Sequence, residues 1–213
     1  MRFTNKTDFI ARVRARLAPP EAVLQPNLKP LDVEVAGDGS GLAIERLRPA
    51  AVLMGLIDRG DDYGVVFTQR PKTMKAHPGQ IALPGGKLEE GESFVEAALR
   101  EAAEEINAPR QNIDVIGQAE PYRTGSGFCV SLIVGEYPSD FKPEPCPHEV
   151  ADVFETPLSF LMTPENHERG QREFLGVMRS YYAMPYNGRY IWGVTAGMIR
   201  NLYDCLYGNN PAS

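Results

Sequence analysis

Residues 86–108 read GKLEEGESFVEAALREAAEEINA, and this segment decides how the rest of the chain is interpreted. Three glutamates, Glu101, Glu104 and Glu105, stand at positions i, i+3 and i+4, so they share one face of a predicted helix. Like charges at this spacing destabilise a helix by roughly 0.2–0.5 kcal/mol per pair. A bound cation would remove that cost, and carboxylate oxygens are the ligands that Mg²⁺ and Mn²⁺ prefer. The segment therefore predicts a metal site on one helix face.

The ends and the buried side of this helix can also be predicted. Ser93 followed by Glu96 has the form of a capping box, which places the N-cap at Ser93. Arg100 precedes Glu104 by four residues and is expected to hold that carboxylate in one rotamer. Asn107 is expected at the C-terminal cap, because asparagine tolerates the left-handed conformation. An apolar stripe is expected to dock the helix on a core, and its members are Phe94, Ala97, Ala98, Ala102 and Ile106.

A turn directly precedes the acidic segment. It reads Leu83-Pro84-Gly85-Gly86, and its glycines allow backbone N–H groups to approach a ligand closely. We therefore expect Gly85 and Gly86 to contact whatever the helix binds.

The segment resembles the signature of the Nudix hydrolases. That signature is a glycine, five residues, a glutamate, seven residues, and then Arg-Glu-apolar-x-Glu-Glu-x-Gly-apolar. The positions that match in register are Gly86, Glu92, Arg100, Glu101, Ala102, Glu104, Glu105 and Ala108. The late glycine is replaced by Asn107, which also tolerates positive φ. The resemblance implies an α+β fold, the Nudix-type α/β/α sandwich with a mixed β-sheet. It also implies metal-dependent hydrolysis of a diphosphate bond, with Mg²⁺ or Mn²⁺ on Glu101, Glu104 and Glu105.

The upstream residues 66–86, VFTQRPKTMKAHPGQIALPGG, resemble a second motif, found in the coenzyme A pyrophosphatases of the Nudix superfamily. The matching positions are Thr68, Arg70, Gly79, Pro84, Gly85 and Gly86, and the departures are Pro71, Lys75 and Leu83. This resemblance implies that coenzyme A or its thioesters are hydrolysed to 3′,5′-ADP and 4′-phosphopantetheine or its acyl form. Arg70 and Lys75 are expected to bind substrate phosphates, with His77 and Gly79 in the same loop.

Two alternatives stay open beside the coenzyme A reading. The departures from the second motif also fit a Nudix pyrophosphohydrolase for ADP-ribose, NADH or a dinucleotide. A more distant alternative is a nucleotide-binding Nudix domain without turnover.

The catalytic roles within the predicted site follow from charge and position. Arg100 is expected to orient the carboxylates beside it, and Glu92 to tether the preceding loop to the helix. The general base that takes a proton from water is expected to be Glu104, Glu105 or Glu149.

The composition of the chain excludes several other classes of protein. Its net charge of −6 over 213 residues argues against general binding of nucleic acid or of an anionic membrane surface. The three cysteines have neither a disulfide framework nor zinc-site spacing, and no apolar run is long enough to span a membrane. We expect a cytoplasmic monomer or homodimer whose partner is a small nucleotide substrate.

The chain is expected to divide into three parts. Residues 1–46 form an N-terminal helix and a surface-wrapping segment, 47–208 form the Nudix domain, and 209–213 form a tail. Helices are predicted over 7–17 and 195–206, and strands over 50–56, 65–70, 113–122, 128–137 and 149–154. The stretch 172–185 is predicted to be one extended element, joined to 190–192 by a hairpin turn at Asn187-Gly188.

Overall fold

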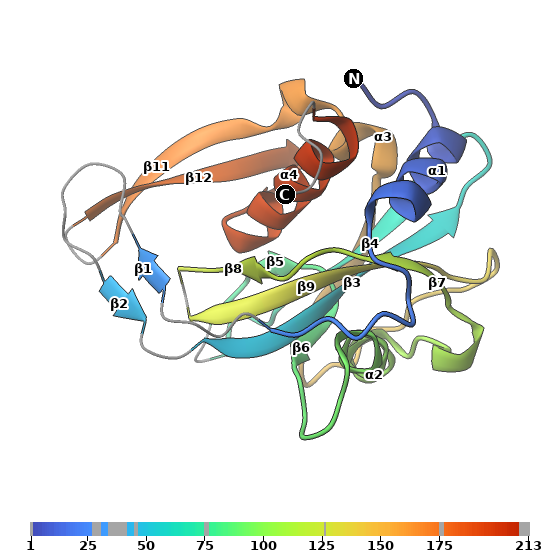
Figure 1. Cartoon of the computed structure of the whole chain (residues 1–213), viewed down its shortest axis with the longest axis horizontal. Helices are drawn as coiled ribbons and strands as arrows, with labels where there is room; N and C mark the ends of the chain where they lie inside the picture. The colour runs from blue at the N-terminus through green and yellow to red at the C-terminus, as the bar shows by residue number, and fades with distance from the viewer. Residues whose placement is uncertain are drawn as a thin grey trace.

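A mixed β-sheet lies between two layers of helices in the computed structural model, which describes residues 2–26, 31–33, 42–44, 47–74, 77–125, 127–174 and 177–208 (Figure 1). Its strand order is β10-β4-β3-β9-β7, with β5, β6 and β8 paired to β4, β3 and β9. The pairing of β3 with β9 is parallel, and the other pairings are antiparallel. The strands are β3 (Arg48–Asp58), β4 (Tyr63–Gln69), β5 (Ile81–Ala82), β6 (Gly85–Lys87), β7 (Asp114–Gln118), β8 (Tyr122–Arg123), β9 (Phe128–Glu136) and β10 (Asp152–Pro157).

The two faces of the sheet carry separate apolar cores. Alternation along a strand sends neighbouring side chains to opposite faces, so Ala51 and Leu53 pack with helix α2 (Phe94–Ile106). Met54 lies on the other face, with helices α1 (Lys6–Arg16) and α4 (Val194–Tyr207). Figure 1 shows α2 on one side of the sheet, and α1 and α4 on the other. The fold is the expected α/β/α sandwich.

Helix α2 begins and ends where the sequence predicts. The Ser93 side chain accepts from the Glu96 backbone N–H and the Glu96 carboxylate accepts from the Ser93 backbone N–H, which completes the capping box. Asn107 takes the left-handed conformation, with φ 55° and ψ 37°. All members of the predicted apolar stripe are buried; they are Phe94, Ala97, Ala98, Ala102 and Ile106.

The N-terminal helix is confirmed and packs on the body of the fold. Phe9 and Val13 of α1 are buried in the core that contains α4. The chain that follows α1 is tied to β7, because the Gln118 side chain donates to the carbonyls of Pro19 and Ala22. The short strands β1 (Leu31–Val33) and β2 (Leu42–Ile44) pair with each other. The division of the chain at residue 46 stays a prediction, and the tail at 209–213 lies outside the described residues.

A second sheet of three antiparallel strands lies on the same side of the main sheet as α4 (Figure 1). It contains β11 (Glu168–Phe174), β12 (Val177–Tyr186) and β13 (Arg189–Trp192). The turn at Asn187-Gly188 is confirmed, and both residues have positive φ. The prediction of one element over 172–185 is wrong, because β11 ends at Phe174 and the chain returns in β12 with Arg172 opposite Arg179. Both strands carry similar polar and aromatic residues, so the reversal leaves little trace in the local pattern.

Two other boundaries differ from the predictions. The strand predicted over 149–154 begins at Asp152, so Glu149 lies in the turn before it. The strand predicted over 113–122 is divided into β7 and β8. Short helices complete the fold: α3 (Leu158–Leu161), and 3-10 turns at Arg110–Asn112 and Pro164–Asn166. None of the helices within the described ranges is long and apolar enough to cross a membrane.

Candidate active site

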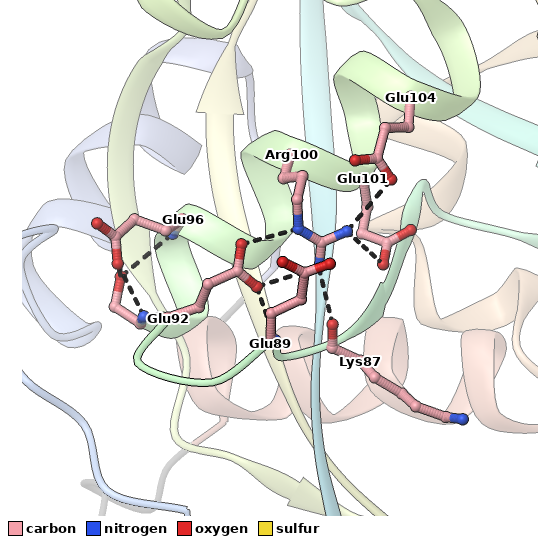
Figure 2. Close-up of polar contacts among 8 residues, drawn as sticks. Lys87, Glu89, Glu92, Glu96, Arg100, Glu101 and Glu104 are labelled. Atoms are coloured by element: carbon pink, nitrogen blue, oxygen red, sulfur yellow. Dashed lines mark hydrogen bonds and ion pairs between the residues drawn. The ribbon is translucent and has the colours of Figure 1, made fainter.

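Arg100 is the centre of the polar contacts at the exposed side of α2 (Figure 2). Its Nε donates to Glu92 Oε1 at 2.8 Å, and its Nη2 donates to the Lys87 carbonyl at 2.9 Å. Its Nη1 lies 3.0 Å from Glu101 Oε1 and 3.2 Å from Glu104 Oε2. The expected contact with Glu104 is therefore present, and Glu92 ties the loop before α2 to the helix as predicted. The hydrogen bond from Arg100 also holds the pKa of Glu92 below its usual value.

The glycines of the turn make room for the first helix carboxylate. Gly86 in β6 pairs with Ala51 of β3, and a Cβ on Gly86 would overlap the carboxylate of Glu101. Gly85 has φ 158°, and a Cβ there would overlap the Ala51 carbonyl oxygen. Gly85 requires glycine because a Cβ would meet the backbone of β3, whereas a Cβ at Gly86 would displace the Glu101 carboxylate.

Glu105 is the buried carboxylate of the three, with 5% of its surface exposed. Its Oε2 accepts a hydrogen bond from Thr68 Oγ1 at 3.4 Å. Burial and the nearby charge of Glu101 raise the pKa of Glu105 to about 8, and the charge of Arg70 opposes this shift. Burial also raises the pKa of Glu101, whereas the Glu104 side chain is 52% exposed. The three carboxylates of α2 therefore differ in burial: Glu105 is buried, Glu101 is half-buried and Glu104 is exposed.

The loop before β10 brings a fourth carboxylate to the helix. The backbone N–H of Glu144 donates to the Ile106 carbonyl, and that of Cys146 donates to the Glu105 carbonyl. Glu149 follows in this loop and is exposed. Its charge contributes to the raised pKa of both Glu101 and Glu105, so the predicted catalytic candidates lie in one electrostatic neighbourhood.

The predicted phosphate-binding loop begins at the end of β4. The Arg70 N–H donates to the Gln80 carbonyl at 3.0 Å, which closes the loop between them. Arg70 Nε is buried and has no hydrogen-bond partner among the described residues. His77, with φ 53°, is exposed, and Gly79 has φ 70°. Lys75, the other predicted phosphate ligand, lies outside the described residues.

A chain of contacts that the sequence analysis missed supports this loop. Gln69 Nε2 donates to the Gly79 carbonyl at 3.2 Å, and Arg189 Nη1 donates to Gln69 Oε1 at 3.0 Å. Arg189 Nη2 also pairs with Asp152 Oδ2 at 2.6 Å. Arg189 stands far from Gln69 in the sequence, so no local pattern could connect them. The Asn187-Gly188 turn was the sequence signal that a strand begins at Arg189.

The oxygen-rich donor set fits a hard divalent cation. As the side chains stand, the described part of the chain contains no group of three Asp, Glu, His or Cys residues gathered closely enough to hold an ion. Arg100 instead holds Glu101 and Glu104. Glu104 is 52% exposed, so its side chain has room to turn away from Arg100.

Comparison with known proteins identifies the family of the chain. The NUDIX domain family matches residues 46–177. The uncharacterized Nudix hydrolase NudL of Photorhabdus laumondii is 32% identical over 197 residues, which cover 92% of this chain and 95% of that protein. The uncharacterized NudL of Enterobacter sp. is 37% identical over 156 residues, covering 73% and 81%.

Solved structures of similar proteins include DR0079 of Deinococcus radiodurans, at 19% identity with a TM-score of 0.48, covering 79% of this chain and 89% of that one. The family match covers the turn, the acidic helix and most of the sheet described above. The chain belongs to the Nudix hydrolase family and is an enzyme that hydrolyses diphosphate bonds.

Proposed function

We propose that this Nudix hydrolase cleaves the diphosphate bond of coenzyme A or its thioesters. The products are then 3′,5′-ADP and 4′-phosphopantetheine or its acyl form. The observation that supports this substrate is the loop after β4, where residues 66–86 resemble the coenzyme A pyrophosphatase motif. Arg70 of that loop places a buried donor, Nε, with no hydrogen-bond partner among the described residues, in the neighbourhood of Glu105.

A buried Nε–H without an acceptor is costly unless a ligand accepts its hydrogen bond. Substrate phosphate is the natural partner, because phosphate oxygens accept charge-assisted hydrogen bonds from arginine. Gly79 is open, since a Cβ there would meet only Lys72 Cγ at 3.5 Å, whereas Gly85 and Gly86 bring the backbone of the turn close to β3 and Glu101. We assign Arg70, Lys75, His77 and these glycines to substrate binding.

The metal ligands in this proposal are Glu101, Glu104 and Glu105, and the ion is Mg²⁺ or Mn²⁺. Such a cation would supply charge compensation for the diphosphate and would acidify water. Burial raises the pKa of Glu105 to about 8, so this carboxylate is the one that gains most from a positive neighbour. Arg100 positions Glu101 and Glu104 through its Nη1 atom.

Glu149 is the general base in this proposal. With Glu104 and Glu105 engaged as ligands, it is the candidate carboxylate that remains exposed and makes no ion pair within the described residues. It would take the proton from the attacking water.

The test is a substrate panel with purified protein and Mg²⁺ or Mn²⁺. Coenzyme A, 3′-dephospho-coenzyme A, ADP-ribose, NADH and dGTP are compared by kcat/KM, and the products are identified by mass. Coenzyme A should be the best substrate and should yield 3′,5′-ADP. Faster turnover of ADP-ribose or NADH would reject this substrate and leave diphosphate hydrolysis in place.

A further inference from the structure

The three-stranded sheet β11–β13 carries a group of arginines and aromatic rings that the catalytic site does not use. We propose that one face of this sheet binds the purine nucleotide end of the substrate, with the base on Tyr181 and Trp192 and a phosphate at Arg172. We call this surface the stacking face and define it by Arg172, Tyr181, Tyr190 and Trp192. The inference rests on the proposed function and deepens it, because it names where the nucleotide half lies.

The strand register places these residues on one face. Tyr181 and Ala183 point the same way along β12, and Trp192 of β13 lies opposite Ala183. Arg172 of β11 lies opposite Arg179, which shares the face of Tyr181. Pairing therefore brings together residues from three strands that the sequence separates.

The aromatic rings hold one another in fixed positions. The centroids of Tyr181 and Trp192 are 5.4 Å apart in an edge-to-face arrangement, and the Tyr181 and Tyr190 hydroxyls are 3.4 Å apart. A Cβ on Gly170 would overlap the Tyr181 ring, so that ring lies across β11. The guanidinium of Arg172 lies 5.5 Å from the Trp192 ring centroid. The face is organised before any ligand arrives, which lowers the entropy cost of binding.

The chemistry of the face matches a base and a phosphate. Tyr190 is 45% exposed, Arg172 is also exposed, and Tyr181 and Trp192 are half-buried. Purine bases stack on such rings, and arginine binds phosphate in a chain whose net charge is −6. Glu168 is the acidic residue on this face, but four strand positions separate it from Arg172, about 13 Å.

The strand that carries Trp192 contacts β5, the short strand before the glycine turn. Thr195, just after β13, donates to the Ile81 carbonyl at 3.3 Å, and β5 runs from Ile81 into the turn at Gly85. Arg179 reaches toward the main sheet, because a Cβ on Gly125 would lie 3.1 Å from its Nη1 atom. In this proposal the diphosphate extends from the stacking face past β5 to the glycine turn.

Trp192 is the single tryptophan of the chain, so it reports on this face alone. Its fluorescence is titrated with adenosine 3′,5′-bisphosphate in EDTA, where no hydrolysis can occur. We expect a saturable change in emission, and Arg172→Ala should weaken the apparent Kd by about tenfold, the loss expected for a charge-assisted contact.

Arg169→Ala is the matched control. Arg169 lies on the same strand, is exposed, and stacks on Tyr182 at 5.5 Å, but it points to the opposite face. Its replacement should change Kd by less than about twofold, a difference within the context scatter of a surface contact. Tyr181→Leu should weaken binding on the order of tenfold through lost stacking. The Tm of each variant shows that the sheet is folded.

Three outcomes would overturn the inference. The first is that the bisphosphate causes no saturable change in Trp192 emission, and the second is that Arg169→Ala and Arg172→Ala have equal effects on Kd. The third is that Trp192 emission depends on protein concentration and not on nucleotide, which would assign the face to contact between two copies of the chain. The proposed function has its own readout. If coenzyme A is hydrolysed but Trp192 emission does not respond to the bisphosphate, only the proposal of the stacking face is contradicted. If the bisphosphate binds but coenzyme A is not hydrolysed, only the proposed substrate is contradicted.

Discussion

Helix α2 and the sheet β11–β13 are built in opposite ways. The helix gathers Glu101, Glu104 and Glu105 by local spacing, and caps at Ser93 and Asn107 fix its ends. The sheet gathers Arg172, Tyr181 and Trp192 by pairing strands from distant parts of the chain. The first region is acidic and is where the diphosphate chemistry is proposed, and the second is cationic and aromatic.

The difference shows how chemistry and recognition can be separated in one enzyme. A helix face fixes carboxylates at a spacing that hardly depends on the rest of the fold. A hairpin sheet can change its rings and arginines without disturbing that spacing. We therefore expect changes on α2 to act on kcat, and changes on the loop and sheet to act on KM.

Removing the metal should have the largest effect, because the proposed mechanism places the cation on the carboxylates of α2. Hydrolysis should vanish in EDTA and return with Mg²⁺ or Mn²⁺. Product release is followed by mass, and a metal-free titration of Trp192 serves as the control for the sheet. Full hydrolysis in the presence of EDTA would contradict the metal-dependent mechanism.

Single carboxylates of α2 come next. Glu104→Gln or Glu105→Gln should each lower kcat by roughly 10²-fold or more, since each removes a ligand charge while keeping its volume. Burial raises the pKa of Glu105, so glutamine at that position is not expected to lower Tm in EDTA. Lys72→Ala, at an exposed loop position, is the control and should cost far less. Similar losses in all three variants would show that the site assignment is wrong.

Arg70→Ala should have an intermediate effect and should act on binding. The loss of a charge-assisted phosphate contact should raise KM by an amount equivalent to about 2–3 kcal/mol. If Arg70 holds the 3′-phosphate, the preference for coenzyme A over 3′-dephospho-coenzyme A should shrink. An unchanged preference, with both substrates slowed equally, would instead assign Arg70 to the diphosphate.

The smallest effect concerns the pH dependence of stability at the base of the second sheet. His167 is 7% exposed, its Nε2 lies 2.7 Å from the Leu161 carbonyl, and its buried Nδ1 has no described partner. Burial lowers its pKa below the usual 6.5, because protonation would add a donor with no acceptor. The stability that neutral His167 provides is present above pH 6.5 and is lost as pH falls through its folded-state pKa.

Thermal unfolding in EDTA checks this prediction. Wild-type Tm should fall more steeply below pH 6.5 than the Tm of His167→Gln, which does not titrate there. Parallel curves for the two proteins would contradict it. Catalytic variants on α2 should leave this acid-side difference unchanged.

The sequence alone predicted the parts of the site that depend on near neighbours. The capping box at Ser93, the left-handed Asn107 and the contact between Arg100 and Glu104 were all foreseeable from spacing. The apolar run over 50–56 and the strand predicted over 65–70 became β3 and β4. The cytoplasmic location and the choice between monomer and homodimer stay predictions.

Tertiary structure decided what no local pattern could contain. The pKa of Glu105, about 8, depends on how deeply the helix is buried and on charges from Arg70 and Glu149. The support of Gly79 by Gln69 and Arg189 depends on where the hairpin returns. Short-range spacing fixes which groups share a helix face, whereas burial and strand pairing depend on the packing of segments distant in sequence, and these set the charge state and surroundings of the same groups.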